Sequence, residues 1–135
     1  MKRAGYAVLV FVLLSGVGAP LSAHHSFAAA YDTSKTITVQ GAIVLVRLTN
    51  PHSWFFLDVK EADGKVVNWA IEAGGPTALL RRGLRRTDFP AGLEVVVEGY
   101  KAKSGAPKAN GRTVTLKDGR NFFLGASDAP GAPPQ

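Results

Sequence analysis

Strand-forming stretches alternate with turn sequences along most of this chain, and this alternation restricts the folds open to it. β-Branched and aromatic residues, which favour strands, are concentrated in residues 37–48, 53–60, 66–72, 93–102, 112–116 and 121–124. One window has the composition of a short helix, because Pro76 suits a first helical turn and Gly83 suits the left-handed residue that ends it. The sequence therefore predicts an all-β class, mainly strands with one short helix.

Local signals give the first details of this β fold. The stretch 37–48 is long, and Gly41 interrupts it where a bulge or sharp bend would be tolerated. The sequence Ala62-Asp63-Gly64-Lys65 is typical of a hairpin, so the second and third stretches are expected to pair antiparallel. Residues 104–111 contain Gly, Pro and Asn and are predicted to form a loop.

The order of three strands, a helix and further strands matches an OB-like five-stranded Greek-key barrel in which the helix covers one end. An open sandwich of short strands is the alternative. The chain has 135 residues and no cysteine, which fits one domain held together by apolar packing. We expect this domain at residues 24–125, followed by a Pro-, Gly- and Ala-rich tail at 126–135 that cannot bury enough apolar area to become ordered.

The first 23 residues are expected to be a cleaved signal peptide. Lys2 and Arg3 form a short basic region, residues 4–18 form an apolar run, and Ala23 supplies a small residue for cleavage. The run is too short for a stable membrane anchor, which takes about 20 apolar residues. We therefore expect a periplasmic or secreted protein without a stable membrane anchor after cleavage, whose mature chain begins at His24.

The charge pattern bears on possible partners. The formal net charge is +6, from 16 Lys+Arg and 10 Asp+Glu. The basic residues are scattered, apart from Arg81-Arg82 and Arg85-Arg86, and an exported protein meets little nucleic acid. Nucleic acid is therefore not an expected partner. For Glu72, at the end of the third stretch, an ion pair with Arg81 or Arg82 explains the residue as well as a catalytic role would, so no catalytic role is assigned to it.

All three histidines lie in two short motifs, His24-His25 and His52. Imidazole is a common ligand of copper, zinc and nickel. A free N-terminal His24 can chelate one ion through its amino group and its ring, and His52 can supply a third nitrogen, a donor set that favours copper. If cleavage instead leaves Ala23 first, an Ala-His-His segment still favours Cu(II) or Ni(II) through its backbone nitrogens. The alternative is that His24-His25 is a mobile start and that His52 caps a strand or stacks on Trp54.

A candidate site for a small ligand combines Asn50 and His52 with Trp54 and Trp69. The two tryptophans lie on the second and third predicted strands, the surface on which OB barrels usually bind, and are expected to meet across the hairpin. The structural alternative is that Asn50-Pro51 only makes a turn and that both tryptophans belong to the core.

Signatures of catalysis are missing from the sequence. It contains no Gly-Xaa-Ser-Xaa-Gly elbow, no cysteine nucleophile, no phosphate-binding Gly-Lys-Ser/Thr loop and no His-Glu-Xaa-Xaa-His helix. We therefore expect a binding module and not an enzyme. Its expected partner is a small ligand or a metal ion, and the more specific hypothesis is copper. The alternative is a structural or interaction protein of the cell envelope that binds a partner protein through its barrel surface.

An ordered set of short motifs gives the chain a family resemblance. The motifs are His24-His25-Ser26-Phe27-Ala28-Ala29, Tyr31-Asp32, Thr49-Asn50-Pro51-His52, Asn68-Trp69, Leu79-Leu80-Arg81-Arg82-Gly83, Gly99-Tyr100-Lys101-Ala102-Lys103, Asn110-Gly111-Arg112 and Asp118-Gly119-Arg120. In these motifs the chain resembles the exported bacterial family of unknown function numbered 6152. The resemblance implies a location and a fold but no activity. Two positions depart from the family pattern: Ala30 stands where the family commonly has an acidic residue, and Leu48 or a neighbour stands where it often has Trp. A cation site that used the acid would therefore be incomplete.

Overall fold

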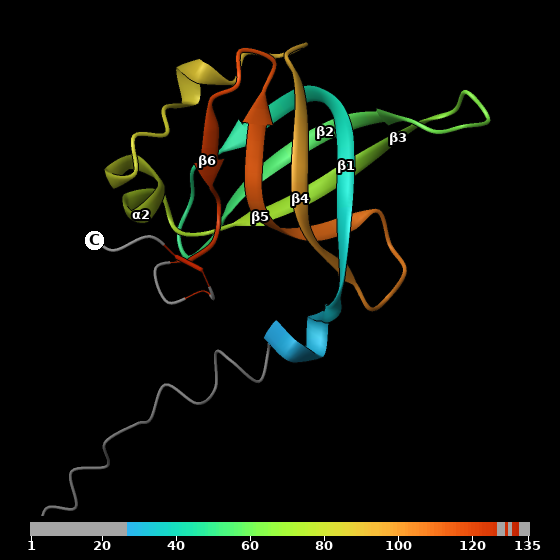
Figure 1. The fold of residues 1–135 in the computed structure, drawn as a ribbon, viewed down its shortest axis with the longest axis horizontal. Helices are drawn as coiled ribbons and strands as arrows, with labels where there is room; N and C mark the ends of the chain where they lie inside the picture. The colour runs from blue at the N-terminus through green and yellow to red at the C-terminus, as the bar shows by residue number, and fades with distance from the viewer. Residues whose placement is uncertain (1–26, 127–128, 130, 133–135) are drawn as a thin grey trace, which may run out of the picture.

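The computed structural model describes residues 27–126, 129 and 131–132. Residues 27–30 are helical and lead directly into the first strand. The elements are β1 (Tyr31–Arg47), β2 (Ser53–Lys60), β3 (Val66–Ala73), α2 (Pro76–Arg81), the 3-10 helix η1 (Arg86–Asp88), β4 (Glu94–Ala102), β5 (Lys108–Leu116) and β6 (Asn121–Phe123). Figure 1 shows α2 at one side of the sheet and the β2–β3 hairpin reaching out at the other. The predicted mainly β fold with one short helix is confirmed.

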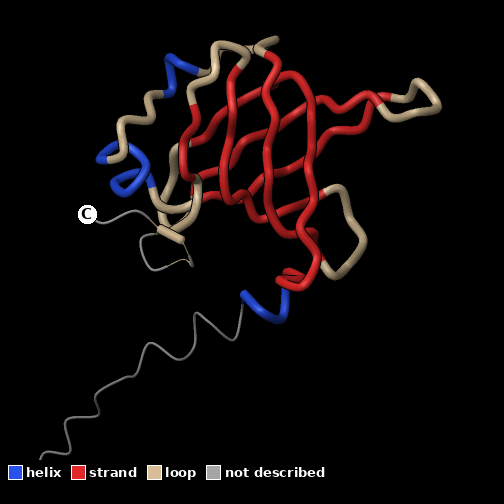
Figure 2. Tube along the Cα trace, viewed as in Figure 1, coloured by secondary structure: helices blue, strands red, loops and turns tan. Residues whose placement is uncertain are grey.

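The six strands form one sheet that closes roughly in a ring (Figure 2). The strand order is β3-β2-β1-β4-β5-β6, and β3 pairs in addition with β5. This additional pair is parallel, whereas the other neighbours are antiparallel. Neighbouring strands therefore follow a circuit from β1 through β2, β3, β5 and β4 back to β1, and β6 extends the sheet beyond β5.

Strand β1 is long because it pairs with two different strands. Its residues from Tyr31 to Ala42 pair with β4, and those from Ala42 onward pair with β2. Gly41 lies where the partner changes, and a Cβ there would be 2.5 Å from the carbonyl oxygen of Asp58, so the close approach of β2 requires glycine. The predicted bend of the first strand is thus confirmed, although the strand begins at Tyr31, earlier than the sequence indicates.

The predicted turn residues have the expected conformations. Gly64 has a φ of 85° in the β2–β3 hairpin, where the backbone N–H of Glu61 donates to Lys65 at 2.8 Å. Pro76 lies in the first turn of α2, and Gly83, with a φ of 86°, follows the end of this helix. Local sequence therefore determines where the chain reverses and where the helix ends.

The loop predicted at residues 104–111 is partly wrong, because β5 begins at Lys108. Small residues allow this segment to lie close to β3: Ala109 is buried, and a Cβ on Gly111 would be 2.8 Å from Ile71 Cγ2. Pairing with both β3 and β4 satisfies backbone groups that a loop would leave to water. The composition favours a turn, but the tertiary pairing makes this segment a strand. The 3-10 helix η1 was not predicted either.

The core is one apolar cluster to which β1 through β5 all contribute. On β4, Val95 and Val97 are buried, as the alternation of this stretch predicts. The Phe55 and Phe89 rings meet edge to face with centroids 5.2 Å apart. Leu79 of α2 is fully buried in the same cluster, so the short helix is fixed to the sheet by apolar packing.

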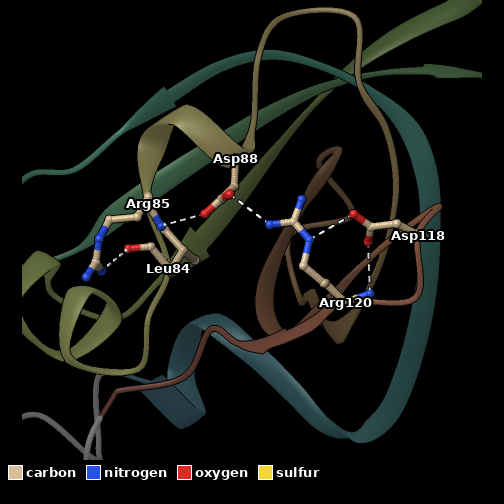
Figure 3. Close-up of polar contacts among 5 residues, drawn as sticks. All are labelled: Leu84, Arg85, Asp88, Asp118 and Arg120. Carbon is tan, nitrogen blue, oxygen red and sulfur yellow. Dashed lines mark hydrogen bonds and ion pairs between the residues drawn. The ribbon is translucent and has the colours of Figure 1, made fainter.

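A charged bridge fixes the segment that follows α2 (Figure 3). Arg120, in the turn between β5 and β6, places Nη1 2.8 Å from Asp88 Oδ1 and Nε 2.8 Å from Asp118 Oδ2. The other Asp88 oxygen accepts the backbone N–H of Arg85 at 3.1 Å. Hydrogen bonding to Arg120 holds the pKa of Asp88 below its ordinary value. The bridge therefore ties η1 to the β5–β6 turn.

Some predictions concern parts of the chain outside the described residues. These are the signal peptide at residues 1–23, the pair His24-His25, and most of the tail at 126–135. Within the described part, no helix combines the length and the apolar character that crossing a membrane requires.

Replacing Gly99 by alanine tests the close contact of β4 with β5. A Cβ at this position would lie 2.1 Å from the carbonyl oxygen of Asn110, a backbone atom fixed by strand pairing. We expect Gly99→Ala to lower the free energy of unfolding by about 1–3 kcal/mol, measured by urea denaturation. Gln40→Ala, at an exposed position of β1, is the control and should change stability by less than about 0.5 kcal/mol. Equal stability of the two variants would contradict the close contact.

Candidate functional site

A buried carboxylate is the centre of the candidate site. Glu72 lies near the end of β3, next to the core residue Ile71 and therefore on the opposite face of the strand. Its side chain is only 11% exposed. Removing an ionised carboxylate from water is unfavourable unless other groups compensate. The side chains that contact Glu72 therefore define the site.

Three side chains from different parts of the fold contact Glu72. Tyr31, the first residue of β1, donates its hydroxyl to Oε2, and His52 pairs through Nδ1 with Oε1. Lys108, the first residue of β5, has its Nζ 4.0 Å from Oε2. Both carboxylate oxygens are thus occupied. Tyr31, His52, Glu72 and Lys108 are termed the Glu72 cluster below.

The ammonium group of Lys108 also lies over two aromatic rings. Its Nζ is 4.9 Å from the centroid of Trp54 and 5.6 Å from that of Tyr31. Attraction between a cation and the face of an aromatic ring stabilises such contacts. Trp54 is paired with Glu72 across the β2–β3 hairpin, so two rings and one carboxylate surround the ammonium. Lys108, whose side chain is 39% exposed, therefore places a positive charge near the Glu72 carboxylate.

Tyr31 is a neutral donor to the cluster. The residue is 3% exposed, and burial, followed by the hydrogen bond to Glu72, raises the pKa of its phenol above the ordinary value. Phe27 covers it, with ring centroids 5.4 Å from Tyr31 and 6.3 Å from Tyr100. Phe27, in the helical residues that precede β1, thus packs against Tyr31.

His52 is the most exposed member of the cluster, with 50% of its side chain accessible. It follows a cis peptide bond between Asn50 and Pro51, and Thr49 Oγ1 donates to the His52 carbonyl oxygen at 3.0 Å. Because Nδ1 is paired with Glu72, Nε2 is the ring nitrogen that remains for a ligand. The cluster therefore holds one imidazole in a fixed orientation at the surface.

An open hollow of about 330 Å³ lies beside this turn. Gly75 approaches the turn closely, since a Cβ there would be 3.1 Å from the Pro51 carbonyl oxygen. The hollow is lined by Asn50, Pro51, His52, Gly75, Thr77, Ala78, Arg81 and Ala126. We refer to it as the His52 hollow. The hollow lies between the 49–52 turn and α2. Two of the predicted ligand-binding residues, Asn50 and His52, contribute to its lining.

The other two predicted ligand-binding residues, Trp54 and Trp69, do not meet across the hairpin. Trp54 is paired with Glu72 and Trp69 with Leu57, an odd number of positions away, so the two rings lie on opposite faces. Trp69 packs against the core, and its Nε1 has no hydrogen-bond partner among the described residues. Trp54 thus belongs to the site, whereas Trp69 is part of the core side of the sheet.

The predicted metal ligands are described only in part. His52 lies in the Glu72 cluster, whereas His24 and His25 fall outside the described residues. In the described ranges, no group of three or more His, Asp or Glu side chains is placed to hold a metal ion. Of the three histidines predicted to bind a metal ion, the described part of the chain therefore contains one, His52, in a fixed orientation.

Glu72 does not form the ion pair with Arg81 or Arg82 that the sequence offered as one explanation of this residue. Glu72 pairs with His52 and Lys108 instead, and Arg82 donates through Nη1 to the Gly125 carbonyl oxygen at 2.6 Å. Sequence reasoning gave Tyr31 and Lys108 no role in the site. Lys108 falls in the predicted loop, and only the family motif at residues 31–32 draws attention to Tyr31.

Comparison with protein families identifies a matching family model. The model of the Family of unknown function (DUF6152) matches residues 12–112. The chain belongs to this family. The matched range contains every residue of the Glu72 cluster and ends before β6. A comparison with curated proteins gives no match.

Alkaline conditions should reveal the burial of Tyr31. Its pKa is raised in the folded state, so the unfolded chain releases this proton first as the pH rises through about 10. The free energy of unfolding should therefore be insensitive to this group below about pH 10 and fall above it by up to about 1.4 kcal/mol per pH unit. Tyr31→Phe removes this contribution, so its stability should fall less steeply in urea denaturation at increasing pH. Parallel curves for the two proteins would contradict the raised pKa.

Proposed function

We propose that this chain is a binding module, not an enzyme, and that it binds a copper ion through His52. The observation that carries the proposal is the contact of His52 Nδ1 with the buried carboxylate of Glu72. A carboxylate at one ring nitrogen fixes the orientation and the tautomer of an imidazole and leaves the other nitrogen as the ligand, an arrangement common around metal-binding histidines. A histidine that only caps a strand needs no such support.

In this proposal, His24 and His25 complete the set of ligands. His24 stands three positions before Phe27, whose ring lies against Tyr31 of the Glu72 cluster. A chain spans at most about 3.6 Å per residue, so three residues give a reach of at most roughly 11 Å from Phe27. The amino group and ring of His24, together with His52 Nε2, form an all-nitrogen donor set, which suits Cu(II).

The proposal includes export of the protein. The amino group of His24 becomes available only when residues 1–23 are removed as a signal peptide, which places the mature chain in the periplasm or outside the cell. The basic pair Lys2-Arg3 and the apolar run at 4–18 support this step.

We also propose that the ring of strands is an OB-like barrel. The circuit of neighbouring strands β1-β2-β3-β5-β4, the bent β1 and the position of α2 between β3 and β4 support it. The β2–β3 surface is the usual binding face of such barrels. Trp54 and Glu72, paired across these two strands, lie at the end of this surface that adjoins His52.

A second candidate function is interaction with another protein of the cell envelope. It is favoured by large apolar side chains at the surface: Val44 and Leu45 of β1 are 43% and 42% exposed, and Val66 is 63% exposed. Such an interaction role requires neither a metal ion nor His52. Copper binding therefore separates the two candidates.

Copper titration tests the proposed function. The full chain is expressed with export, its mature N-terminus is determined by mass spectrometry, and Cu(II) binding is measured by calorimetry near neutral pH. We expect one copper ion per chain, with a dissociation constant in the micromolar range or below. Glu72→Gln should weaken binding by about 10–100-fold because the imidazole loses its orientation, and His52→Asn should weaken it further because a ligand is lost.

The control for this titration is Asp63→Asn, which removes an exposed carboxylate charge in the β2–β3 turn, away from the Glu72 cluster. This variant should bind copper as the original protein does. Copper affinity that is unchanged in His52→Asn would contradict the role of His52, and the absence of any micromolar binding would contradict the metal-binding function as a whole.

A further inference from the structure

We propose that the His52 hollow binds a small carboxylate anion through Arg81. This inference goes beyond the proposed copper binding, because the anion needs no metal ion. The polar groups that line the hollow are the side chains of Asn50, His52, Thr77 and Arg81. Among the described residues that line it none is acidic, and Arg81 is the one that carries a permanent positive charge.

Arg81 differs from Arg82 and Arg85 in that its guanidinium group has no partner among the described residues. Arg82 donates to the Gly125 carbonyl oxygen at 2.6 Å, and Arg85 donates to the Leu80 carbonyl oxygen at 2.8 Å. Arg81 makes no ion pair or hydrogen bond with any residue in the described part of the chain. A guanidinium group on the wall of a hollow without an acidic partner is a binding group for an anion.

The lining favours a carboxylate among small anions. The planar fork of a guanidinium group donates two parallel hydrogen bonds to the two oxygens of a carboxylate. The Thr77 hydroxyl and the Asn50 amide offer further donors on neighbouring walls. Gly75, Ala78 and Ala126 have small side chains or none, which leaves room for the anion. The volume of about 330 Å³ is at the small end of the range for ligand pockets, so the ligand has few heavy atoms.

Both walls of the hollow are held in place before a ligand arrives. On one wall, His52 is fixed by Glu72. On the other, Leu79 of α2 is fully buried, and the guanidinium of Arg82 lies 4.9 Å from the ring centroid of Phe123. Binding to a preformed site avoids the entropy cost of ordering it. Arg81 therefore projects from a helix whose position does not depend on the ligand.

The test uses malonate as the probe. The ¹⁵N-labelled exported chain is titrated in buffer freed of metal ions on a chelating resin, and amide shifts are followed by NMR. We expect saturable shifts at Asn50, Thr77 and Ala78 with a dissociation constant of about 1 mM or below. Arg81→Ala should weaken binding at least tenfold, and Arg81→Lys should lie in between because it keeps the charge but loses the fork.

Two controls separate a site from general charge attraction. Arg86→Ala removes the same charge from η1, outside the hollow, and should leave malonate affinity within about twofold of the original. Malonamide, which has the shape of malonate without its charge, should not bind. Equal weakening by Arg86→Ala, equal binding of malonamide, tighter binding of inorganic phosphate than of malonate, or no saturation would each overturn the proposal.

Malonate binding and copper binding are measured independently of each other. No copper is present, so failure of the copper titration leaves the malonate result unaffected, and failure with malonate leaves the copper result unaffected. If the spectrum of Arg81→Ala shows loss of folding, Arg81→Lys decides, because it preserves the aliphatic packing of the side chain. Unchanged malonate affinity in Arg81→Lys would then overturn the role of the guanidinium fork.

Discussion

The parallel pairing of β3 with β5 is the contact on which both the ring of strands and the candidate site depend. It sets Ala70 opposite Lys108 and Glu72 opposite Asn110, and so brings the ammonium of Lys108 to the Glu72 carboxylate. Without this pairing, the six strands would form an open sheet with β3 as a free edge, and Glu72 would lose its cation. The close approach is possible because small residues of β5 face β3, with Gly111 against the Ile71 side chain. The pairing that closes the sheet therefore also places the positive charge of Lys108 beside the buried Glu72 carboxylate.

A buried acid is an inefficient way to stabilise a small domain. Ion pairs removed from water rarely contribute more than apolar residues of the same volume would, because desolvation offsets the attraction. Glu72 nevertheless lies on the strand face away from the core and is surrounded by a phenol, an imidazole and an ammonium group. The imidazole is half-exposed, so the cluster is not sealed from water. The physical cost of this arrangement is easier to explain if Glu72 orients His52 for a ligand than if it serves stability alone.

The sequence predicted those features that neighbouring residues decide. The bounds of β2, the hairpin glycine at Gly64 and the short helix after Pro76 all follow from local propensity, and the structure confirms them. The site depended on contacts between distant segments, which no single-sequence pattern encodes. Residues 108–111 have the composition of a turn and become a strand only because β3 and β4 lie on both sides. The two tryptophans were expected to meet because their strands are adjacent, but adjacency does not set the register, and the register places Glu72 opposite Trp54.

His52 belongs both to the Glu72 cluster and to the lining of the hollow, so the two proposed ligands are energetically linked. A copper ion on His52 Nε2 would add positive charge to a hollow that already contains the guanidinium group of Arg81. Repulsion between the two charges would weaken copper binding. A carboxylate bound in the same hollow would reduce this repulsion, and its oxygens are also ligands that copper accepts. Each ligand should therefore strengthen binding of the other, and by thermodynamic linkage the two factors must be equal. On this argument the module binds a metal ion together with an anion better than either alone, because the anion offsets the positive charge that the metal ion adds beside Arg81.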